Sequence, residues 1–380
     1  MKGFKVVTLV GTRPELIKLS MTIAELDRSV DHILVHTGQN YEFELNEVFF
    51  RDLGIRKPDH FLSAAGATPA ATISQVIERF DHVLEQEKPD AMLLLGDTNS
   101  CLGVIVAKRR RIPVFHMEAG NRCFDDRVPE EINRRIVDHT SDVNLPYTEH
   151  ARRYLIAEGL PAGRIIKTGS PMTEILRHFR PQIDASTALE AHGLSHGGYF
   201  VVSAHREENV DEPARLRALI QALNVVTARH DAPALFSTHP RTRQRLEALG
   251  GVDASAQVRF VKPLGFFDYV RLQLDARCVI SDSGTLTEES AILGFPGVMI
   301  RDAHERPEGM DEGTVVMSSL EPGALLRAIE LVSRQSDVPR RLPPDYAPED
   351  VSRKVVRIIL SYTDLVNRTV WSKAPAERVQ

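Results

Sequence analysis

Short apolar, β-branched runs alternate with longer amphipathic stretches from one end of the 380-residue chain to the other. Because parallel strands covered on both faces are continuously apolar, this alternation predicts an α/β protein with parallel sheets. The apolar runs predict strands at Phe4–Val10, His32–His36, Ala91–Leu95, Pro113–His116, Asp142–Leu145, Arg164–Thr168, Tyr199–Ser203, Ala234–Ser237, Val258–Lys262, Arg277–Ser281 and Gly297–Arg301. Helical spacing of apolar residues predicts helices at Glu15–Leu26, Ala70–Gln86 and Ala214–Arg229.

A segment that carries Gly, Ser and two prolines, Lys167–Pro181, separates the two series of predicted strands. It marks a domain boundary, and we predict two Rossmann-like, doubly wound domains, residues 1–170 and 171–361, that face a central cleft. The late helical pattern at Asp350–Ser361 is expected to pack back across both domains. A helix at about 362–380 is expected to pack on the first domain.

Charge and cysteine content exclude several classes of protein. The chain has 47 Lys and Arg against 52 Asp and Glu and no basic block, so nucleic acid and anionic membranes are not expected partners. Cys101, Cys123 and Cys278 form no CxxC pair, which argues against a disulfide scaffold or a structural zinc site. The first apolar run is too short for a signal peptide or a membrane helix, and we expect a cytoplasmic protein.

Small polar clusters follow most of the predicted strands. Ligands of open parallel sheets bind at the carboxyl ends of the strands, where these clusters lie. The clusters are 11–15, 36–39, 96–100, 116–120, 203–208, 237–241 and 281–285. Turn formation and helix capping explain any one cluster, but seven at the same edges of two sheets predict a polar site between two domains.

Two of the clusters have features of anion sites. The first lacks the GxGxxG pattern of a dinucleotide site, and Arg13 and Lys18 suit a phosphate or a carboxylate better than a nicotinamide cofactor. At Ser283–Thr285, free backbone amides at the start of a helix would face a bound anion. A capping box from Thr285 to Glu288 accounts for Glu288, which leaves Glu289 as an acceptor for the hydroxyls of a ribose.

Three carboxylates of the first half are candidates for acid–base chemistry. Asp97 and Glu118 follow predicted strands, and Glu130 lies in the first turn of a helix that starts at Pro129. Glu130 and Arg134 are at i and i+4, so a solvated ion pair on the helix surface is the alternative interpretation. Carboxylates that converge in one crevice would acquire different pKa values and hence separate acid and base roles.

The histidines allow two functional interpretations. The pairs His116 with Glu118 and His205 with Glu208 contain metal-ligand residue types, but no HExxH, cysteine cluster or Asp-rich loop supports a metal, and we expect none. His205 and His239 each follow a strand and precede Arg206 and Arg241, which suits a pyrophosphate. A buried, structural His239 is an equal alternative.

Seven stretches, spread from Val10 to Val315, carry a family resemblance. They are VGTRPELIKLS, LLGDTNS, HMEAGNRCFDDRVPEEINRRIVDH, VVSAHREEN, STHPRT, ISDSGTLTEES and IRDAHERPEGMDEGTV. In order and spacing they resemble the non-hydrolysing UDP-N-acetylglucosamine 2-epimerase family. The resemblance implies a glycosyltransferase-B architecture, a UDP-sugar substrate, no NAD or metal cofactor, and a homodimer.

The resemblance also implies roles for individual residues. Asp97, Glu118 and Glu130 correspond to the catalytic carboxylates, and His205 corresponds to the catalytic histidine near the diphosphate. The UDP-sugar-binding residues that it implies are Arg13, Lys18, Arg206, Ser283, Gly284, Thr285, Glu289, Arg301, His304, Glu305 and Arg306.

Two departures from the family pattern bear on the substrate. This chain reads EAGNRCFDDRVPEE where the usual enzymes read EAGLRT with a longer connection to PWPEE, and TGQNYEFE where many members have AQHRE, a segment used by an allosteric substrate molecule. Both departures resemble the branch that converts UDP-2-acetamido-2,6-dideoxy-L-talose to UDP-N-acetyl-L-fucosamine for capsule or O-antigen polysaccharides. We therefore predict this 2-epimerisation, through elimination of UDP, a 2-acetamidoglycal and re-addition of UDP.

Other functions remain open from the sequence. The first alternative is interconversion of UDP-N-acetylglucosamine and UDP-N-acetylmannosamine by the same chemistry. A UDP-sugar glycosyltransferase could share the architecture, since one fold serves many functions. A non-catalytic UDP-sugar-binding protein and a hydrolysing epimerase are the remaining alternatives.

Overall fold

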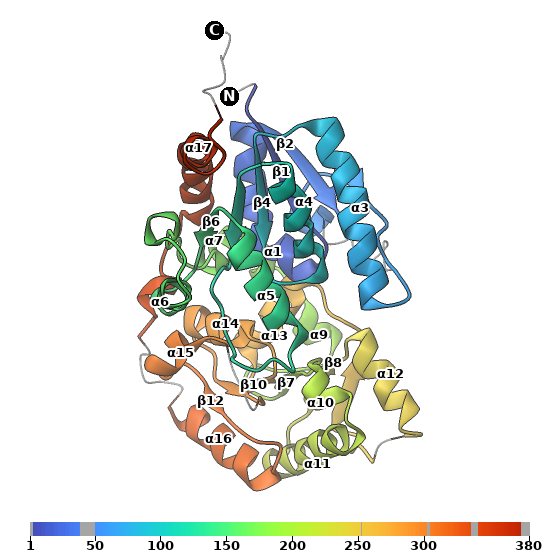
Figure 1. The fold of residues 1–380 in the computed structure, drawn as a ribbon. Helices are drawn as coiled ribbons and strands as arrows, with labels where there is room; N and C mark the ends of the chain where they lie inside the picture. The colour runs from blue at the N-terminus through green and yellow to red at the C-terminus, as the bar shows by residue number, and fades with distance from the viewer. Residues whose placement is uncertain (1–2, 39–49, 252, 302–304, 336–340, 374–380) are drawn as a thin grey trace. The chain divides into compact units, whose positions relative to one another are not determined.

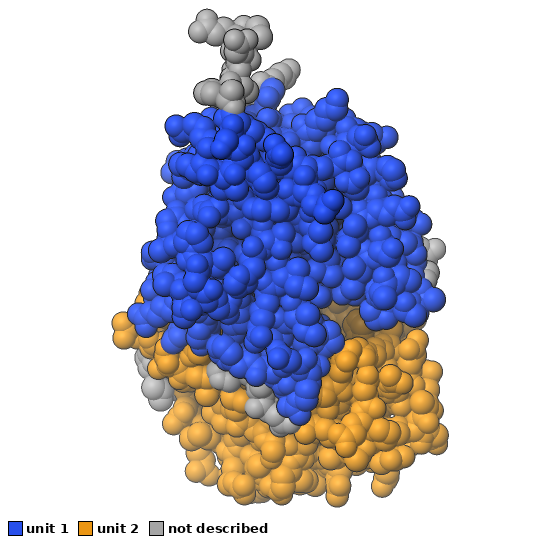
Figure 2. Space-filling model, in the orientation of Figure 1, with its two compact units in different colours: residues 1–175, 347–380 blue, residues 176–346 orange. Residues whose placement is uncertain are grey.

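The computed structural model describes residues 3–38, 50–251, 253–301, 305–335 and 341–373 (Figure 1). The chain divides into two compact units, which Figure 2 shows in different colours. Unit 1 contains Met1–Ile175 and Ala347–Gln380, and unit 2 contains Leu176–Tyr346. The chain therefore passes from unit 1 to unit 2 within the connector that the sequence predicts at 167–181. The chain returns to unit 1 at Ala347, so residues 347–361 belong to unit 1 and not, as predicted, to the second domain.

The sheet of unit 1 has six parallel strands in the order β3-β2-β1-β4-β5-β6. The strands are β1 (Lys5–Val10), β2 (Asp31–His36), β3 (His60–Phe61), β4 (Ala91–Leu95), β5 (Val114–Met117) and β6 (Val143–Leu145). The order of strands reverses at β1, which pairs with β2 on one side and β4 on the other. Ligands of doubly wound sheets bind at the carboxyl end of such a switch point.

The helices of unit 1 cover both faces of this sheet. Phe80, Val104 and Val137 pack with strand residues such as Val7 and Met92 on one face, whereas α1 contacts β1 and β2 and also packs against α17 (Figure 1). The helices are α1 (Arg13–Ser29), α3 (Pro69–Glu87), α4 (Val104–Arg109), α5 (Pro129–Thr140), α6 (Glu149–Ala157) and α17 (Val351–Thr369), with 3₁₀ turns η1 (Asn99–Gly103) and η2 (Ala162–Arg164). The helix α7 (Met172–His178) contains the boundary between the units, since unit 1 ends at Ile175.

The sheet of unit 2 also has six parallel strands, in the order β12-β11-β10-β7-β8-β9. The strands are β7 (Phe200–Ser203), β8 (Ala234–Ser237), β9 (Val258–Val261), β10 (Cys278–Ser281), β11 (Gly297–Met299) and β12 (Val316–Met317). The helices are α8 (Arg180–Asp184), α9 (Ala188–Ala191), α10 (Glu207–Val210), α11 (Pro213–His230), α12 (Pro240–Ala248), α13 (Phe266–Asp275), α14 (Thr285–Leu293), α15 (Pro307–Asp311) and α16 (Pro322–Arg334), with the 3₁₀ turn η3 (Pro344–Tyr346).

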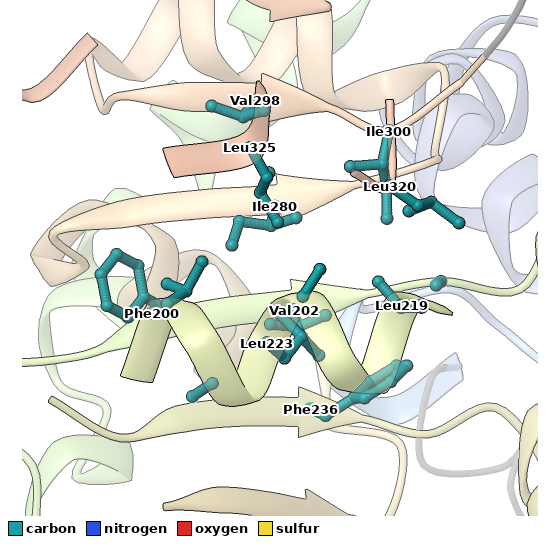
Figure 3. Packing of buried hydrophobic residues seen from close by; sticks show 14 of the residues in the cluster. Phe200, Val202, Leu219, Leu223, Phe236, Ile280, Val298, Ile300, Leu320 and Leu325 are labelled. Carbon is teal, nitrogen blue, oxygen red and sulfur yellow. The ribbon is translucent and has the colours of Figure 1, made fainter. Parts of the chain in front are cut away.

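Alternate residues of the unit 2 strands enter two separate cores. Phe200 and Val202 of β7 pack with Leu219 and Leu223 of α11 on one face (Figure 3), and Val201 lies in a second buried cluster on the other. Successive side chains of a strand point to opposite faces, so a strand that is buried on both sides must be apolar throughout. The prediction of two doubly wound α/β units with parallel sheets is therefore confirmed.

Three differences from the predicted strands have simple causes. The segment Arg164–Thr168 makes one bridge, between Ile165 and Asn144 of β6, and contains the end of η2 instead of a strand. The pairing is limited because its partner, the edge strand β6, is only three residues long. The strands β3 and β12 were not predicted, because two residues are too few to produce a period.

Among the described residues, no helix is long and apolar enough to cross a membrane. The three cysteines are buried and make no disulfide.

Candidate functional site

Five sequence-predicted residues of unit 1 follow three adjacent parallel strands. Arg13 and Lys18 lie on α1 after β1, Asp97 follows β4, Glu118 follows β5, and Glu130 lies in the first turn of α5. The strands β1, β4 and β5 are neighbours, so their carboxyl ends bring these loops to one edge of the sheet. We call these residues the unit 1 site.

Glu118 has an unusual backbone and a well-defined carboxylate. Its φ of +64° lies in the left-handed region, which costs free energy for a residue with a Cβ and is maintained only when its surroundings enforce it. Lys18 Nζ lies 2.6 Å from Oε2, and Asn121 Nδ2 donates to Oε1 at 3.3 Å. Lys18, which the resemblance assigned to UDP binding, thus forms an ion pair with the predicted catalytic carboxylate.

A buried ionic cluster supports the loop that carries Glu118. Asp138 accepts hydrogen bonds from the amide of Gly120 and from Arg122, and its Oδ1 lies 2.9 Å from His116 Nδ1. The second ring nitrogen of His116 lies 2.8 Å from the carbonyl oxygen of Gly96. Both ring nitrogens of His116 therefore already have hydrogen-bond partners within unit 1. The sequence offered no signal for Asp138, which lies in the last turn of α5.

Two side chains of α5 bind Asp97. Arg134 places Nε 3.0 Å and Nη2 2.7 Å from Oδ2 of Asp97, and Asn133 donates to the Asp97 carbonyl at 3.0 Å. Arg134 is buried and also pairs with Glu131, so it is not the solvated surface residue that the alternative interpretation required. The helix α5, which carries Glu130 in its first turn, is therefore tied to the loop of Asp97.

Glu15, which the sequence assigned to helix capping only, has a larger role in the structure. Its carboxylate accepts the amides of Gly11 and Thr12 and the hydroxyl of Thr98, the last at 2.6 Å. Burial raises its pKa to about 7, because loss of solvation outweighs the hydrogen bonds that favour the carboxylate; the charge of Asp97 raises it further. The bond to Thr98 has no local sequence signal.

In unit 2, a buried carboxylate organises the loops that follow β7 and β10. Asp282 accepts the amides of His205 and Arg206 at 3.0–3.1 Å and the side chain of Asn209 at 3.1 Å. Its Oδ1 also lies 3.6 Å from Nδ1 of His205. The order of strands reverses between β7 and β10, so Asp282 lies at the switch point of this sheet.

The segment Ser283–Thr285 leads into α14, as predicted, but its capping differs. The prediction of free amides fails for two of its residues, because Ser283 donates its amide to Oγ of Ser281 at 3.0 Å and Thr285 donates to Oγ of Ser283 at 3.4 Å. Gly284 is the N-cap, and the hydroxyls of Ser283 and Thr285 lie 3.0 Å apart. The predicted capping box of Thr285 and Glu288 is wrong, since Thr285 is already the first helical residue and Glu288 is buried beside Arg306 at 2.9 Å. This ion pair, rather than a cap, accounts for Glu288.

Charged residues form a second cluster in unit 2. Arg301 Nη2 lies 3.4 Å from a Glu305 oxygen, and Arg206 Nη2 lies 3.6 Å from the same oxygen. Arg301 is buried and also approaches Glu208. His304 lies outside the described residues, as does most of the TGQNYEFE segment.

The ribose candidate and the second histidine have clear surroundings. Glu289 is buried and accepts a hydrogen bond from Gln273 at 2.6 Å. His239 is exposed, so the alternative of a buried structural residue is wrong, and its ring centre lies 6.2 Å from that of His205. Arg241 forms ion pairs with Asp211 and Glu207.

Metal-ligating residues do not cluster in the parts of the chain that the structure describes. No group of three or more His, Cys, Asp or Glu side chains there is arranged to hold a metal ion.

Comparison with known proteins gives one consistent result. A family model described as UDP-N-acetylglucosamine 2-epimerase matches residues 24–360. A UDP-N-acetylglucosamine 2-epimerase of Methanocaldococcus jannaschii is 32% identical over 336 residues, which cover 86% of this chain and 92% of that protein. A UDP-2,3-diacetamido-2,3-dideoxy-D-glucuronate 2-epimerase of Pseudomonas aeruginosa is 34% identical and covers 82% of this chain, with 88% of that protein aligned.

Solved structures agree with these relatives. The structure of a UDP-N-acetylglucosamine 2-epimerase from Rickettsia bellii is 52% identical, with a TM-score of 0.89 over 97% of this chain and 100% of that one. The M. jannaschii enzyme in complex with UDP-GlcNAc and UDP has a TM-score of 0.88 at 30% identity, over 94% of this chain and 100% of that one.

Proposed function

The chain belongs to the UDP-N-acetylglucosamine 2-epimerase family, and from this premise we propose that it inverts C-2 of a UDP-linked 2-acetamido sugar. The substrate pair that the relatives support best is UDP-N-acetylglucosamine and UDP-N-acetylmannosamine. The observation that carries the proposal is the unit 1 site, in which a strained Glu118 paired with Lys18 shares a sheet edge with Asp97 paired with Arg134.

The chemistry needs a proton acceptor and a stabilised leaving group. A carboxylate removes the C-2 proton while the bond from C-1 to the diphosphate oxygen breaks, and the electron pair of the C–H bond becomes the C-1–C-2 double bond. The products are a 2-acetamidoglycal and UDP. Delivery of a proton to the opposite face of C-2 and re-addition of UDP at C-1 give the epimer, so no atoms are gained or lost.

The two units supply different parts of this reaction in the proposal. Asp97, Glu118 and Glu130 act as acid and base, without a division of roles among them. In unit 2, His205 and the N-terminus of α14 stabilise the departing diphosphate, and Glu289 accepts the ribose hydroxyls. Three features support the diphosphate subsite: the N-terminus of α14, the Asp282 network that orients the His205 loop, and the cationic Arg206 and Arg301.

Isotope exchange in D₂O tests the reaction. Turnover of UDP-N-acetylglucosamine should introduce one deuterium at C-2 of the product, and ¹⁸O in the bridging position should scramble into the diphosphate. A product that keeps the hydrogen of the substrate at C-2 would contradict the elimination route. The proposal needs no metal or nicotinamide, so dialysis against EDTA should leave the rate unchanged.

One observation favours a second substrate, UDP-2-acetamido-2,6-dideoxy-L-talose. The departure from EAGLRT places Asn121, a hydrogen-bond donor to Glu118, where the usual enzymes carry Leu. The polar contact changes the surroundings of a candidate catalytic group. The P. aeruginosa relative is named for a third substrate, UDP-2,3-diacetamido-2,3-dideoxy-D-glucuronate, so relatives of this chain differ in the UDP-sugar for which they are named. NMR analysis of the products from each UDP-sugar distinguishes the two substrates.

The same assay separates the remaining alternatives. Incubation with a UDP-sugar and no acceptor should equilibrate the two epimers, which a glycosyltransferase or a binding protein does not do. Release of free sugar as the main product would indicate a hydrolysing epimerase. We also propose a homodimer, from the family resemblance, and sedimentation of the purified protein tests it.

A further inference from the structure

The buried carboxylate of Glu15 joins the two loops that flank the switch point of the unit 1 sheet. One of its oxygens accepts the amides of Gly11 and Thr12, and the other accepts the hydroxyl of Thr98. The first loop continues into Arg13, and the second carries Asp97 directly before Thr98. Glu15 therefore contacts both loops and is 3% exposed, so water does not replace it as an acceptor.

These loops are in close contact, and their separation is set by side chains. A Cβ on Gly11 would lie 1.9 Å from Oγ of Ser100 and 2.4 Å from Oγ1 of Thr37, so only glycine fits there. The hydroxyls of Thr37 and Ser100 are themselves 2.7 Å apart. The pairing of β1 with β4 ends at Leu9 and Leu94, before either loop begins. Beyond that point, the bond from Thr98 to Glu15 connects the two loops directly.

The charged and titratable groups around Glu15 come from the β4 loop and η1, and Arg134 of α5 pairs with one of them. Asp97, on the β4 loop, raises the pKa of Glu15, and the buried thiol of Cys101 on η1 has its own pKa raised by burial and by Glu15. Arg134 of α5 neutralises Asp97. Burial has the largest effect on Glu15 and brings its pKa to about 7, so the group changes charge in the neutral range.

Protonation would change the hydrogen bonds that hold the loops. Charge-assisted bonds to a carboxylate are roughly twice as strong as neutral ones, so the amides of Gly11 and Thr12 would be held less firmly by a neutral Glu15. The oxygen that faces two amide donors has no room for a proton, so the proton would lie on the oxygen that faces Thr98. The hydroxyl of Thr98 would then have to turn and accept instead of donating.

We propose that Glu15 is a positioning residue for the epimerase reaction, and that its carboxylate form holds the Arg13 loop and the Asp97 loop in their active arrangement. The inference rests on the proposed function, because turnover is one of its readouts. In this role Glu15 influences turnover through the positions of Arg13 and Asp97, and it does not contact the substrate itself.

The pH dependence of kcat tests this role. The wild-type kcat should rise through about pH 7, the value to which burial brings the pKa of Glu15. Glu15→Gln has the shape of the neutral form at every pH, so its kcat should fall about tenfold at pH 8, change little at pH 6, and lose the inflection. Asp142→Asn is the control, since it alters a buried carboxylate that binds Val114 and Lys108 at the opposite edge of the sheet. Its pH profile should match the wild type.

The second loop supplies an independent pair of variants. Thr98→Val keeps the shape of the side chain but removes the donor to Glu15, and it should reproduce the loss seen at pH 8. Thr98→Ser keeps the hydroxyl and should retain most of the activity. A Glu15→Gln enzyme with the wild-type profile overturns the inference. If Glu15→Gln does not fold, equal kcat values for the Val and Ser variants at pH 8 overturn it.

A spectroscopic measurement separates this inference from the proposed function. The infrared difference spectrum between pH 6 and pH 8 should contain a protonated-carboxyl band that is absent from Glu15→Gln. If the wild type shows no epimerase activity, the proposed function fails while the band still reports on Glu15. An active wild type without that band overturns the inference alone.

Discussion

Glu118 combines three features that seldom occur together in a residue without a function. Its backbone is left-handed, its carboxylate pairs with a buried lysine, and the loop behind it is held by the cluster around Asp138. Strained residues of this kind cost of order 1–3 kcal/mol and persist only where the surrounding structure enforces them. In Glu118 the enforcing contacts come from α1 and from α5, and they place the carboxylate at the edge of the sheet.

The variant Glu118→Gln tests the assignment of this residue. Loss of one acid–base group costs typically 10²–10⁴ in rate, so kcat should fall by roughly this factor. Affinity for UDP should fall through the loss of the ion pair with Lys18, but much less than kcat, because the proposed diphosphate and ribose contacts belong to unit 2. Steady-state kinetics and calorimetry with UDP measure the two effects. Glu149→Gln, at the first residue of α6, is the matched control, and equal kcat values for both variants would contradict the assignment.

At the scale of elements, α17 shows how the end of the chain completes unit 1. Its buried stripe includes Val355, Ile359 and Val366, and it packs against α1, the helix that carries Arg13 and Lys18. The first turn is held by Ser352, whose amide donates to Glu174 at 2.9 Å. The last helix thus supports a helix of the candidate site, although more than 300 residues separate them in the sequence.

Truncation of this stripe should therefore destabilise unit 1. Ile359 is fully buried, and an Ile→Ala change in a core costs about 2–5 kcal/mol because it removes apolar contacts and leaves a cavity. Urea unfolding followed by tryptophan fluorescence measures the loss in free energy of unfolding of Ile359→Ala, since the single tryptophan, Trp371, lies in unit 1. Arg353→Ala, on the exposed face of α17, should change the free energy of unfolding by less than about 0.5 kcal/mol. Equal effects of the two variants would show that the stripe is not a core.

At the scale of the whole molecule, groups with opposite pKa shifts determine how stability depends on pH. Hydrogen bonds and ion pairs lower the pKa of carboxyls such as Asp81 and Glu87, so they stabilise the fold above their unfolded pKa and lose this effect on acidification. The pKa of Glu15 shifts in the opposite direction. Its pKa rises from 4.5 to about 7, so the folded state binds the proton more tightly and loses stability as the pH rises through that window.

A comparison of the wild type with Glu15→Gln isolates this contribution. The glutamine does not titrate, so the difference in free energy of unfolding should shift by roughly 2–3 kcal/mol in favour of the variant between pH 5 and pH 8. Urea unfolding at both pH values, followed through Trp371, measures it. A difference that stays constant with pH would mean that Glu15 does not titrate in this range.

Much of the candidate site was visible in the sequence because its signals are local. The polar clusters after apolar strands identified the loops of Asp97, Glu118 and Ser283, and the parallel topology was implied by continuously apolar runs. The family comparison bears out the epimerase class. The roles of the individual site residues, including Glu130, His205 and Glu289, stay predictions that the proposed variants test.

The contacts that orient these residues depend on the tertiary structure. The hydroxyl of Thr98 donates to Glu15, 83 residues away in the sequence, and the amide of His205 donates to Asp282, 77 residues away. Lys18 and Glu118, which form an ion pair, are 100 residues apart. No periodicity or capping rule reports such pairs, because each arises only when neighbouring strands bring distant loops to the same edge. The sequence by itself determined the class of fold and the residue types at the strand ends. Packing decided which carboxylate is strained, which is paired and which is buried, since these properties depend on solvent exclusion and on partners far along the chain.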